Sequence, residues 1–264
     1  MGVRAMGAFA AGICLFPLFV FGAWICTYKN VLRTATNSFW MRLLPVEANL
    51  LCFFILTRLA RRSACRDAMM RDEARALCLK LQTSPPQRGS VCFIGSSTFT
   101  YWRRLAEDMA GLPTYNASFG GSMSHEPLEH LDGLVFRHAP SVVVYFCGTN
   151  DLLARAPPAL VLDNFRSFVQ AVRQWNPAVR IIYLNITLTP FHCYCGAARV
   201  GAIRAANALV AEYAAGSDVT FVDTSDDAYE ADLSFYLGDG HHLNDAGHTR
   251  LAHTLRPAVE AAFG

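Results

Sequence analysis

Ser97 stands where a short apolar run gives way to polar residues, in the segment Val91-Cys-Phe-Ile-Gly-Ser-Ser-Thr. This segment predicts a buried strand that ends abruptly and turns into a helix. A hydroxyl at such a turn lies at the carboxyl edge of an open α/β sheet, beside the backbone amides of a helix N-terminus. Ser97 is therefore a candidate nucleophile. The alternative is that Ser96, Ser97 and Thr98 only cap the helix. A base and an acidic residue elsewhere in the chain would favour the nucleophile over the cap.

Asp239 and His242 lie three residues apart near the C-terminal end, in the segment Asp-Gly-His-His-Leu-Asn. A serine hydroxyl is a poor nucleophile until a base takes its proton, and an imidazole base needs a group that fixes its tautomer. Asp239 and His242 fit these two roles, and their spacing favours His242 over the neighbouring His241. Taken alone, this segment could also be an ordinary solvent-exposed loop.

Gly121 and Asn150 follow two other predicted strands. The oxyanion that forms during acyl transfer needs hydrogen-bond donors aimed at it. The backbone amides of Ser97 and Gly121 and the side chain of Asn150 could provide them. Taken singly, Gly121 fits a turn residue and Asn150 a turn or helix cap. Four loops at strand ends, in this order, together predict a site for nucleophilic acyl chemistry.

The elements that must position these residues are strands and helices that alternate along the chain. The predicted strands are Val91–Ile94, Thr114–Asn116, Ser141–Cys147, Arg180–Asn185 and Val219–Asp223. Helical periodicity marks His125–Phe136, Pro157–Trp175, Val200–Ala214 and the segment with Leu251, Leu255, Val259 and Phe263. The segment Ile186–Arg199 is expected to be a loop. This alternation predicts a mainly parallel sheet covered by helices on both faces.

The amino-terminal segment Gly7–Thr27 contains no charged residue and is long enough to span a bilayer as a helix. Trp24 and Tyr28 near its end suit a membrane interface. An uncleaved membrane anchor is therefore predicted, with a cleaved signal peptide as the alternative and the side of the membrane left open. Polar residues interrupt the second apolar run, Leu43–Leu59, which fits an interfacial or re-entrant segment or a poor second span.

Three regions follow from these patterns. Residues 1–62 are predicted as a hydrophobic membrane anchor region, residues 63–88 as a helical arm and linker, and residues 89–264 as the catalytic domain. Within the arm, apolar residues recur at helical spacing between Arg66 and Gln82, and the proline-containing segment after Thr83 ends the helix.

Net charge and cysteine spacing argue against a nucleic-acid partner, a disulfide framework and a metal site. The formal net charge of +2 is close to neutral, which argues against nucleic acid as a partner. The nine cysteines show no paired spacing, so no disulfide framework is predicted. Cys193 and Cys195 lie beside His192, but no second cluster completes a set of metal ligands, so no metal is expected.

From about Arg71 to the C-terminus, the chain resembles the SGNH, or GDSL-type, hydrolases. Four blocks in order carry the resemblance: Phe93-Ile-Gly-Ser-Ser97 with Trp102, Asn116-Ala-Ser-Phe-Gly-Gly-Ser122, Gly148-Thr-Asn-Asp151 and Asp239-Gly-His-His-Leu-Asn244. The chain is most similar to the branch with Phe-x-Gly-Ser-Ser in the first block, where Ser96 replaces a common acidic residue.

The resemblance implies a flavodoxin-like three-layer α/β/α sandwich with a five-stranded sheet. It implies Ser97 as the nucleophile, His242 and Asp239 as the other members of a triad, and Gly121 and Asn150 in the oxyanion hole. No metal or organic cofactor is implied. The expected activity is a serine esterase or acylhydrolase acting on lipid-like or short acyl esters. An O-acyltransferase, a carbohydrate deacetylase or a catalytically silent binding module of the same fold are the alternatives.

Overall fold

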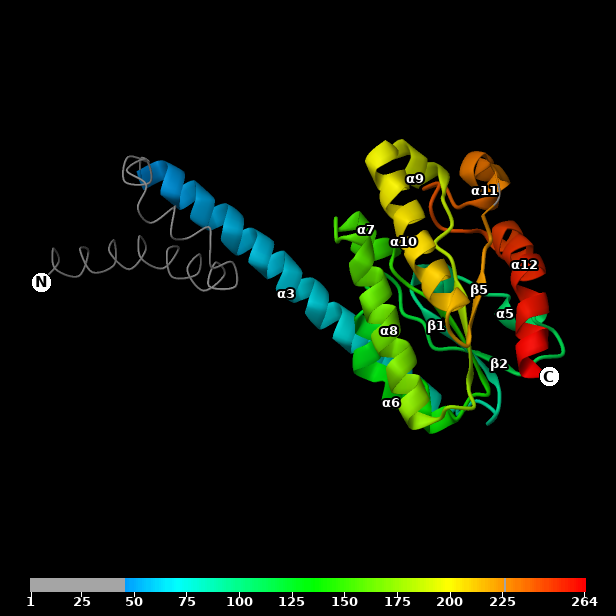
Figure 1. Ribbon diagram of the computed structural model, residues 1–264. Coiled ribbons are helices and arrows are strands. Elements are labelled where there is room, and N and C mark those ends of the chain that lie inside the picture. Colours follow the sequence, from blue (N-terminus) through cyan, green and yellow to red (C-terminus); the bar gives the residue numbers. More distant parts are fainter. Residues whose placement is uncertain (1–45, 226) are drawn as a thin grey trace, which may run out of the picture. The chain divides into compact units, whose positions relative to one another are not determined.

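The computed structural model describes residues 46–264 of the chain, apart from residue 226. The chain divides into two compact units, residues 1–68 and residues 69–264, and the second unit contains every predicted site residue (Figure 1). The segment Gly7–Thr27, where a membrane anchor was predicted, lies outside the described residues. The described part of Leu43–Leu59 belongs to a helix, α3 (Val46–Thr83). Within residues 46–264, no helix is both long enough and apolar enough to cross a bilayer.

The second unit is built on a five-stranded sheet. Its strands lie in the spatial order β2 (Thr114–Asn116), β1 (Val91–Gly95), β3 (Val142–Phe146), β4 (Arg180–Leu184) and β5 (Val219–Val222). All neighbouring strands are parallel. The predicted strands are therefore confirmed apart from their ends. This order is that of flavodoxin-like sheets, whose ligands bind where the order reverses, here between β1 and β3.

Helices cover both faces of the sheet, and a separate apolar core fills each interface. One core joins the sheet to the C-terminal turns of α3, to α8 (Pro158–Trp175) and to α10 (Ala197–Ala215). The other joins it to α4 (Ser97–Thr100), α5 (Leu105–Asp108) and α12 (Asp245–Phe263). In Figure 1, α8 and α10 lie on the opposite side of the sheet from α12. The three-layer sandwich is confirmed.

The helix predicted between Arg66 and Gln82 is part of the longer α3, and its expected apolar face is confirmed. Met70, Ala74 and Leu81 are buried in the same core as the central strands. The C-terminal part of α3 therefore belongs to the second unit, because its apolar face packs into the core of that unit.

Three segments differ from the prediction. The helix expected over His125–Phe136 is broken into η2 (Glu126–His130), α6 (Leu131–Leu134) and η3 (Phe136–His138). Gly133 lies within this segment and weakens a continuous α-helix, since glycine is a poor helix former.

The loop expected over Ile186–Arg199 contains a short helix, α9 (Pro190–Tyr194), which begins after Thr189. The Thr189 side chain accepts a hydrogen bond from the His192 backbone N–H and caps it. The polar segment after β5 likewise contains α11 (Asp227–Ala231) and η4 (Leu233–Phe235).

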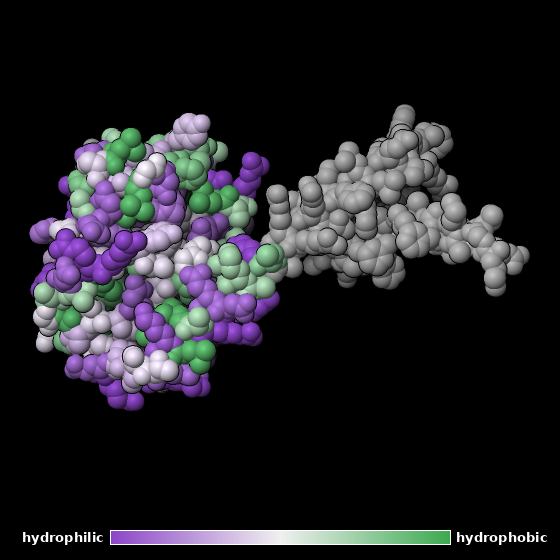
Figure 2. Space-filling view, turned by 180° about the vertical axis from the view of Figure 1, so that it is seen from behind, coloured by the Kyte–Doolittle hydropathy of each residue, from purple (hydrophilic) through white to green (hydrophobic). Residues whose placement is uncertain are grey.

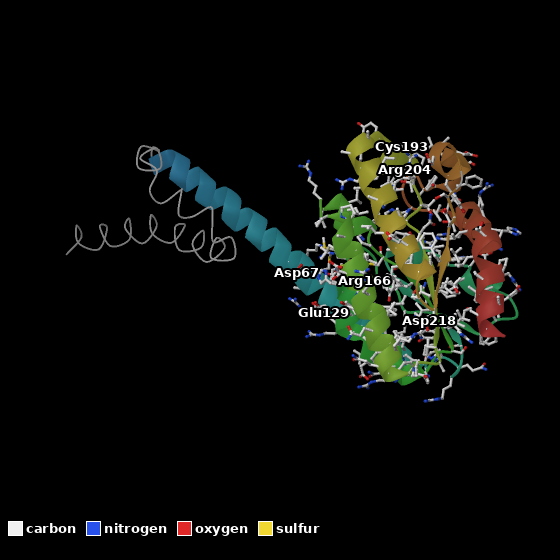
Figure 3. All side chains as sticks on the ribbon, in the orientation of Figure 1. Asp67, Glu129, Arg166, Cys193, Arg204 and Asp218 are labelled. Carbon is white, nitrogen blue, oxygen red and sulfur yellow. The ribbon has the colours of Figure 1, made fainter. Side chains whose placement is uncertain are left out.

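The amino-terminal and carboxyl-terminal ends of the strands form two opposite edges of the sheet, and the predicted site residues lie at one of them. Figure 3 marks the amino-terminal edge by Asp218, just before β5, and the opposite, carboxyl-terminal edge by Cys193 in α9. Figure 2 shows hydrophilic and hydrophobic residues interspersed over the face seen from behind. All predicted site residues follow carboxyl ends of strands or precede α12, so they gather at the carboxyl-terminal edge.

Candidate active site

The turn after β1 places Ser97 at the first position of α4. Ser96 caps this helix, and its Oγ accepts a hydrogen bond from the Ser97 backbone N–H at 2.6 Å. The strand must end in glycine here, because a Cβ on Gly95 would lie 1.8 Å from the Phe146 carbonyl oxygen of β3. The close approach of β1 and β3 brings Ser97 to the switch point of the sheet, with its side chain partly exposed.

Asp239 and His242 form a hydrogen-bonded pair on the loop before α12. The Nδ1 atom of His242 lies 2.6 Å from Asp239 Oδ2, which leaves Nε2 as the nitrogen that can accept a proton. The other carboxylate oxygen, Oδ1, accepts the backbone N–H groups of His241 and His242 at 2.9 Å each. Burial acts to raise the pKa of Asp239, but these hydrogen bonds outweigh it and lower that pKa to about 2. The carboxylate is therefore charged at neutral pH.

Contacts between α4 and the start of α12 hold this loop beside the Ser97 turn. The Tyr101 and His242 rings meet in a T-shaped arrangement, with 4.8 Å between the ring centroids. His248 of α12 stacks on Trp102, and its Nε2 lies 2.8 Å from the Thr98 carbonyl oxygen. Among the described residues, no hydrogen bond joins the Ser97 hydroxyl to His242 directly. Catalytic hydrogen bonds are often long before substrate binds and tighten in its complex.

The other two candidates lie in the segments that follow β2 and β3. Gly121 follows β2 with a φ of 76°, a conformation that glycine adopts without strain. Asn150 lies in α7 (Thr149–Leu153), and its Nδ2 donates to the Ser122 carbonyl oxygen at 3.0 Å and to Ser96 Oγ at 3.2 Å. The Asn150 amide thus bridges the glycine loop and the residue before Ser97, which brings these three segments together.

Asp151, which the sequence reasoning did not single out, holds the glycine loop in place. Its side chain is 1% exposed, and its two carboxylate oxygens accept the backbone N–H and the hydroxyl of Ser124, each at 2.8 Å. Asn164 of α8 donates to the same Ser124 hydroxyl at 2.8 Å. Burial raises the pKa of Asp151, although the Ser124 hydrogen bonds oppose the shift. The sequence held one indication of this role, because Asp151 directly follows Asn150 in the Gly-Thr-Asn-Asp block.

The two neighbouring histidines differ in environment. The His241 ring packs against His192 and Phe191, with ring centroids 5.0 and 5.2 Å away, and Asp239 meets only its backbone N–H. Burial, followed by the proximity of His242, lowers the pKa of His241 to about 4. His192 is 1% exposed, and burial, followed by His241, lowers its pKa to about 3. Both rings are neutral at pH 7. Of the two neighbouring histidines, His242 is the one whose ring contacts the Asp239 carboxylate.

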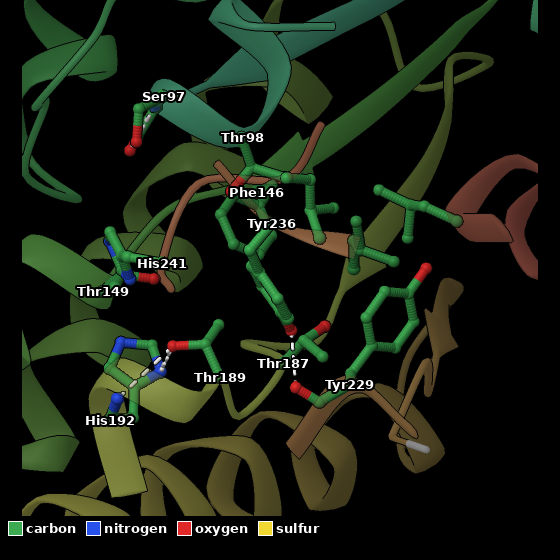
Figure 4. A pocket seen from close by; sticks show the side chains of 14 residues that line it. Ser97, Thr98, Phe146, Thr149, Thr187, Thr189, His192, Tyr229, Tyr236 and His241 are labelled. Atoms are coloured by element: carbon green, nitrogen blue, oxygen red, sulfur yellow. Dashed lines mark hydrogen bonds between the residues drawn. The ribbon is translucent and has the colours of Figure 1, made fainter. Parts of the chain in front are cut away.

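Two of the spaces that the described residues form lie at this edge of the sheet. The first, the inner cavity, extends from Ser97 and Thr98 toward Thr149, Thr189, His192 and His241 (Figure 4). The second, the outer groove, lies along Tyr101, Arg103, Leu237, Asn244 and Asp245. Leu243 lines both spaces, and it directly follows His242, the predicted base, in the chain.

Cys193 and Cys195 are exposed free thiols on and next to α9. In the described residues, no three His, Cys, Asp or Glu side chains converge as metal ligands.

Comparison with solved structures identifies the fold. A Streptococcus pneumonia protein described as a platelet activating factor has 23% identity and a TM-score of 0.65, covering 76% of this chain and 99% of its own. A carbohydrate esterase family 3 protein from Talaromyces cellulolyticus has 20% identity and a TM-score of 0.56, covering 66% and 97%. A GDSL-like lipase from Bacteroides thetaiotaomicron has 21% identity and a TM-score of 0.56, covering 66% and 89%. No curated protein sequence matches the chain.

These likenesses and the sheet order place the chain among three-layer α/β proteins with a flavodoxin-like sheet. The model of the GDSL-like lipase/acylhydrolase family matches residues 93–250, more than half of the chain, and the chain belongs to this family. The predicted resemblance to GDSL-type hydrolases, which act on esters, is confirmed. The narrower assignment to the Phe-x-Gly-Ser-Ser branch stays a prediction.

Proposed function

We propose that this protein is a serine esterase that cleaves carboxylic esters through an acyl-serine intermediate. One observation carries the proposal above all others: the hydrogen-bonded Asp239–His242 pair is held against the helix that begins with Ser97. Family membership supports ester hydrolysis as the reaction class. The site geometry supports these three side chains as the ones that perform it.

In the first half of the reaction, the Ser97 Oγ attacks the ester carbonyl carbon while His242 Nε2 takes the hydroxyl proton. Asp239 stabilises the imidazolium from the Nδ1 side, where it already accepts a hydrogen bond. The bond between the carbonyl carbon and the alcohol oxygen then breaks, and His242 returns the proton to the leaving alcohol. In the second half, water attacks the acyl-serine by the same route, which releases the acid and restores Ser97.

The developing oxyanion needs donors, and three are proposed: the backbone amides of Ser97 and Gly121 and the Asn150 side chain. Asn150 Nδ2 already points at this region, since it contacts Ser96 and Ser122 on either side of the candidate position. On substrate binding it would exchange its longer bond, to Ser96 Oγ, for one to the oxyanion. None of these steps uses a metal or an organic cofactor.

The test is hydrolysis of p-nitrophenyl acetate by the full chain and by Ser97→Ala. Loss of a nucleophile in such a triad lowers kcat by roughly 10⁴-fold or more, so the variant should fall to background. Ser90→Ala is a matched control, because this buried serine lies just before β1 at the other edge of the sheet. It should retain wild-type turnover.

Equal activity of Ser97→Ala and wild type would contradict the assignment of the nucleophile. Absence of turnover in correctly folded wild-type protein, across several esters, would contradict the esterase proposal and favour a silent binding module. If acyl transfer to an added alcohol outpaced hydrolysis, the protein would instead be an acyltransferase.

A further inference from the structure

The inner cavity and the outer groove differ greatly in size. Measured as the volume that the centre of a water molecule can occupy, the inner cavity has about 30 Å³ and the outer groove about 440 Å³. One water requires about 10–15 Å³ by this measure, so the inner cavity holds two or three groups of methylene size. The outer groove has room for a far larger substituent.

Their positions assign each space to one part of an ester. The inner cavity is lined by Ser96, Ser97 and Thr98, so it adjoins the residue proposed as the nucleophile. The outer groove adjoins His242, since Tyr101 contacts the His242 ring and the Leu237 N–H donates to the His242 carbonyl oxygen at 2.7 Å. The leaving alcohol receives its proton from the histidine and must lie on that side. The inner cavity, which Ser97 lines, is therefore assigned to the acyl chain.

The walls of the inner cavity are braced against expansion. The Tyr236 hydroxyl donates to the Tyr229 carbonyl oxygen at 2.6 Å, and the Thr187 and Thr224 hydroxyls share a bond of 2.8 Å. On another wall, Thr189 Oγ1 lies 3.1 Å from His192 Nδ1 (Figure 4). Widening the cavity would break bonds between buried groups, each costly to leave unsatisfied. Such a cavity discriminates by length.

The inner cavity also lacks charge. No Asp, Glu, Lys or Arg is among the described residues that line it. Its two histidines, His192 and His241, have pKa values lowered to about 3 and about 4, chiefly by burial, and are neutral at pH 7. A carboxylate on the acyl chain would find no compensating partner there.

We infer that the inner cavity is an acyl pocket for neutral acyl groups of up to about four carbons, and that Leu243 separates it from an outer groove for the alcohol part. This inference rests on the proposed esterase function. The sequence analysis allowed both lipid-like and short acyl esters. The inner cavity favours short acyl esters of bulky alcohols.

The test compares kcat/KM for p-nitrophenyl acetate, butyrate and octanoate, with the octanoate below its micellar concentration. The leaving group is constant, so the ratio reports the acyl pocket alone. Each excess methylene in a pocket that cannot hold it is penalised, so wild-type protein should prefer acetate to octanoate by about 100-fold or more.

Leu243→Ala should open the inner cavity into the outer groove and reduce this preference by about tenfold. Leu112→Ala is the matched control, because Leu112 is also partly buried against the same core but precedes β2, at the opposite edge of the sheet. It should leave the acetate-to-octanoate ratio unchanged.

Faster turnover of octanoate than of acetate by wild-type protein would overturn the acyl-pocket inference while leaving the esterase proposal standing. An unchanged ratio in folded Leu243→Ala would overturn the role of Leu243 as the dividing wall. If Leu243→Ala does not fold, the wild-type ratio still decides the chain-length inference. Failure of the esterase proposal is distinct, because it would appear as no turnover of any ester.

Discussion

The two halves of the candidate site are built in contrasting ways. The half with Ser97 and Asn150 is fixed by hydrogen bonds among buried groups, including the Asp151 carboxylate, which is 1% exposed. The half with Asp239 and His242 lies on a surface loop, where these side chains are 48% and 26% exposed. The first half shares its residues with the protein core, whereas the second depends on local hydrogen bonds. Substitutions should therefore separate stability from activity according to the half in which they fall.

The largest effect on activity is expected from His242→Ala. Without the base, kcat should fall by roughly 10⁴-fold or more, because serine is then a poor nucleophile. Stability should change by less than about 1 kcal/mol, since the removed ring is on the surface loop. The measurements are ester hydrolysis and urea unfolding, with His253→Ala on the exposed face of α12 as the control. A large loss of stability in His242→Ala would break the contrast between the halves.

Asp239→Asn should reduce kcat by up to about 10⁴-fold, because an amide cannot stabilise the imidazolium and favours the wrong tautomer of His242. The fold should survive, and circular dichroism should match wild type. An Asp239→Asn variant with unimpaired kcat would show that the short Asp239–His242 bond is structural only. Asp163→Asn, on the exposed face of α8 and away from both spaces, offers an acidic control.

In the buried half, Asp151→Ala should lower the free energy of unfolding by about 2–3 kcal/mol, because the Ser124 N–H and hydroxyl lose their shared acceptor. Displacement of the glycine loop should also lower kcat/KM by about 10- to 100-fold. Urea denaturation and ester hydrolysis measure these changes. Asp163→Ala, on the exposed part of α8, should do neither. Wild-type stability in Asp151→Ala would contradict the account of the buried half.

A smaller effect concerns pH and stability. His192, His241 and His248 all have a pKa lowered by burial, to about 3 for His192 and about 4 for His241, from an ordinary value of 6.5. Between those values and 6.5 the unfolded chain binds protons that the folded chain does not, so the free energy of unfolding should decline as the pH falls below 6.5. It should be fully retained above 6.5.

Urea unfolding between pH 7.5 and about pH 4.5 measures this decline, which passes through the window set by the histidine shifts. His192→Leu should make it shallower, even though the variant loses the contact with Thr189. His253→Leu, on the exposed surface, is the control. A decline as steep in His192→Leu as in wild type would contradict the buried, neutral state of His192.

The sequence predicted the parts of the fold that depend on strong local patterns. Four of the five strands are mainly apolar runs, whereas β2 is the short segment Thr114–Asn116. The helix α8 and the end of α3 show apolar residues at helical spacing. The contact between Asp239 and His242 also follows from spacing, since residues three apart in a tight loop meet easily. These features need no knowledge of distant contacts.

Other features depend on contacts between distant segments. The bracing of the glycine loop by Asp151 is such a contact, because Asp151 and Ser124 lie 27 residues apart in the chain. The inner cavity is formed by side chains from several loops, and its volume is invisible in any one of them. Sequence patterns could name the candidate catalytic residues but not the space left for a substrate.

The central claim is that Ser97 is the hydroxyl that His242 activates. The most direct measurement is to react the full chain with a fluorophosphonate and map the modified residue by mass spectrometry of peptides. The account predicts a single adduct on Ser97, no adduct in Ser97→Ala, and a much slower reaction in His242→Ala. An adduct on another residue, or equal labelling rates in wild type and His242→Ala, would contradict it.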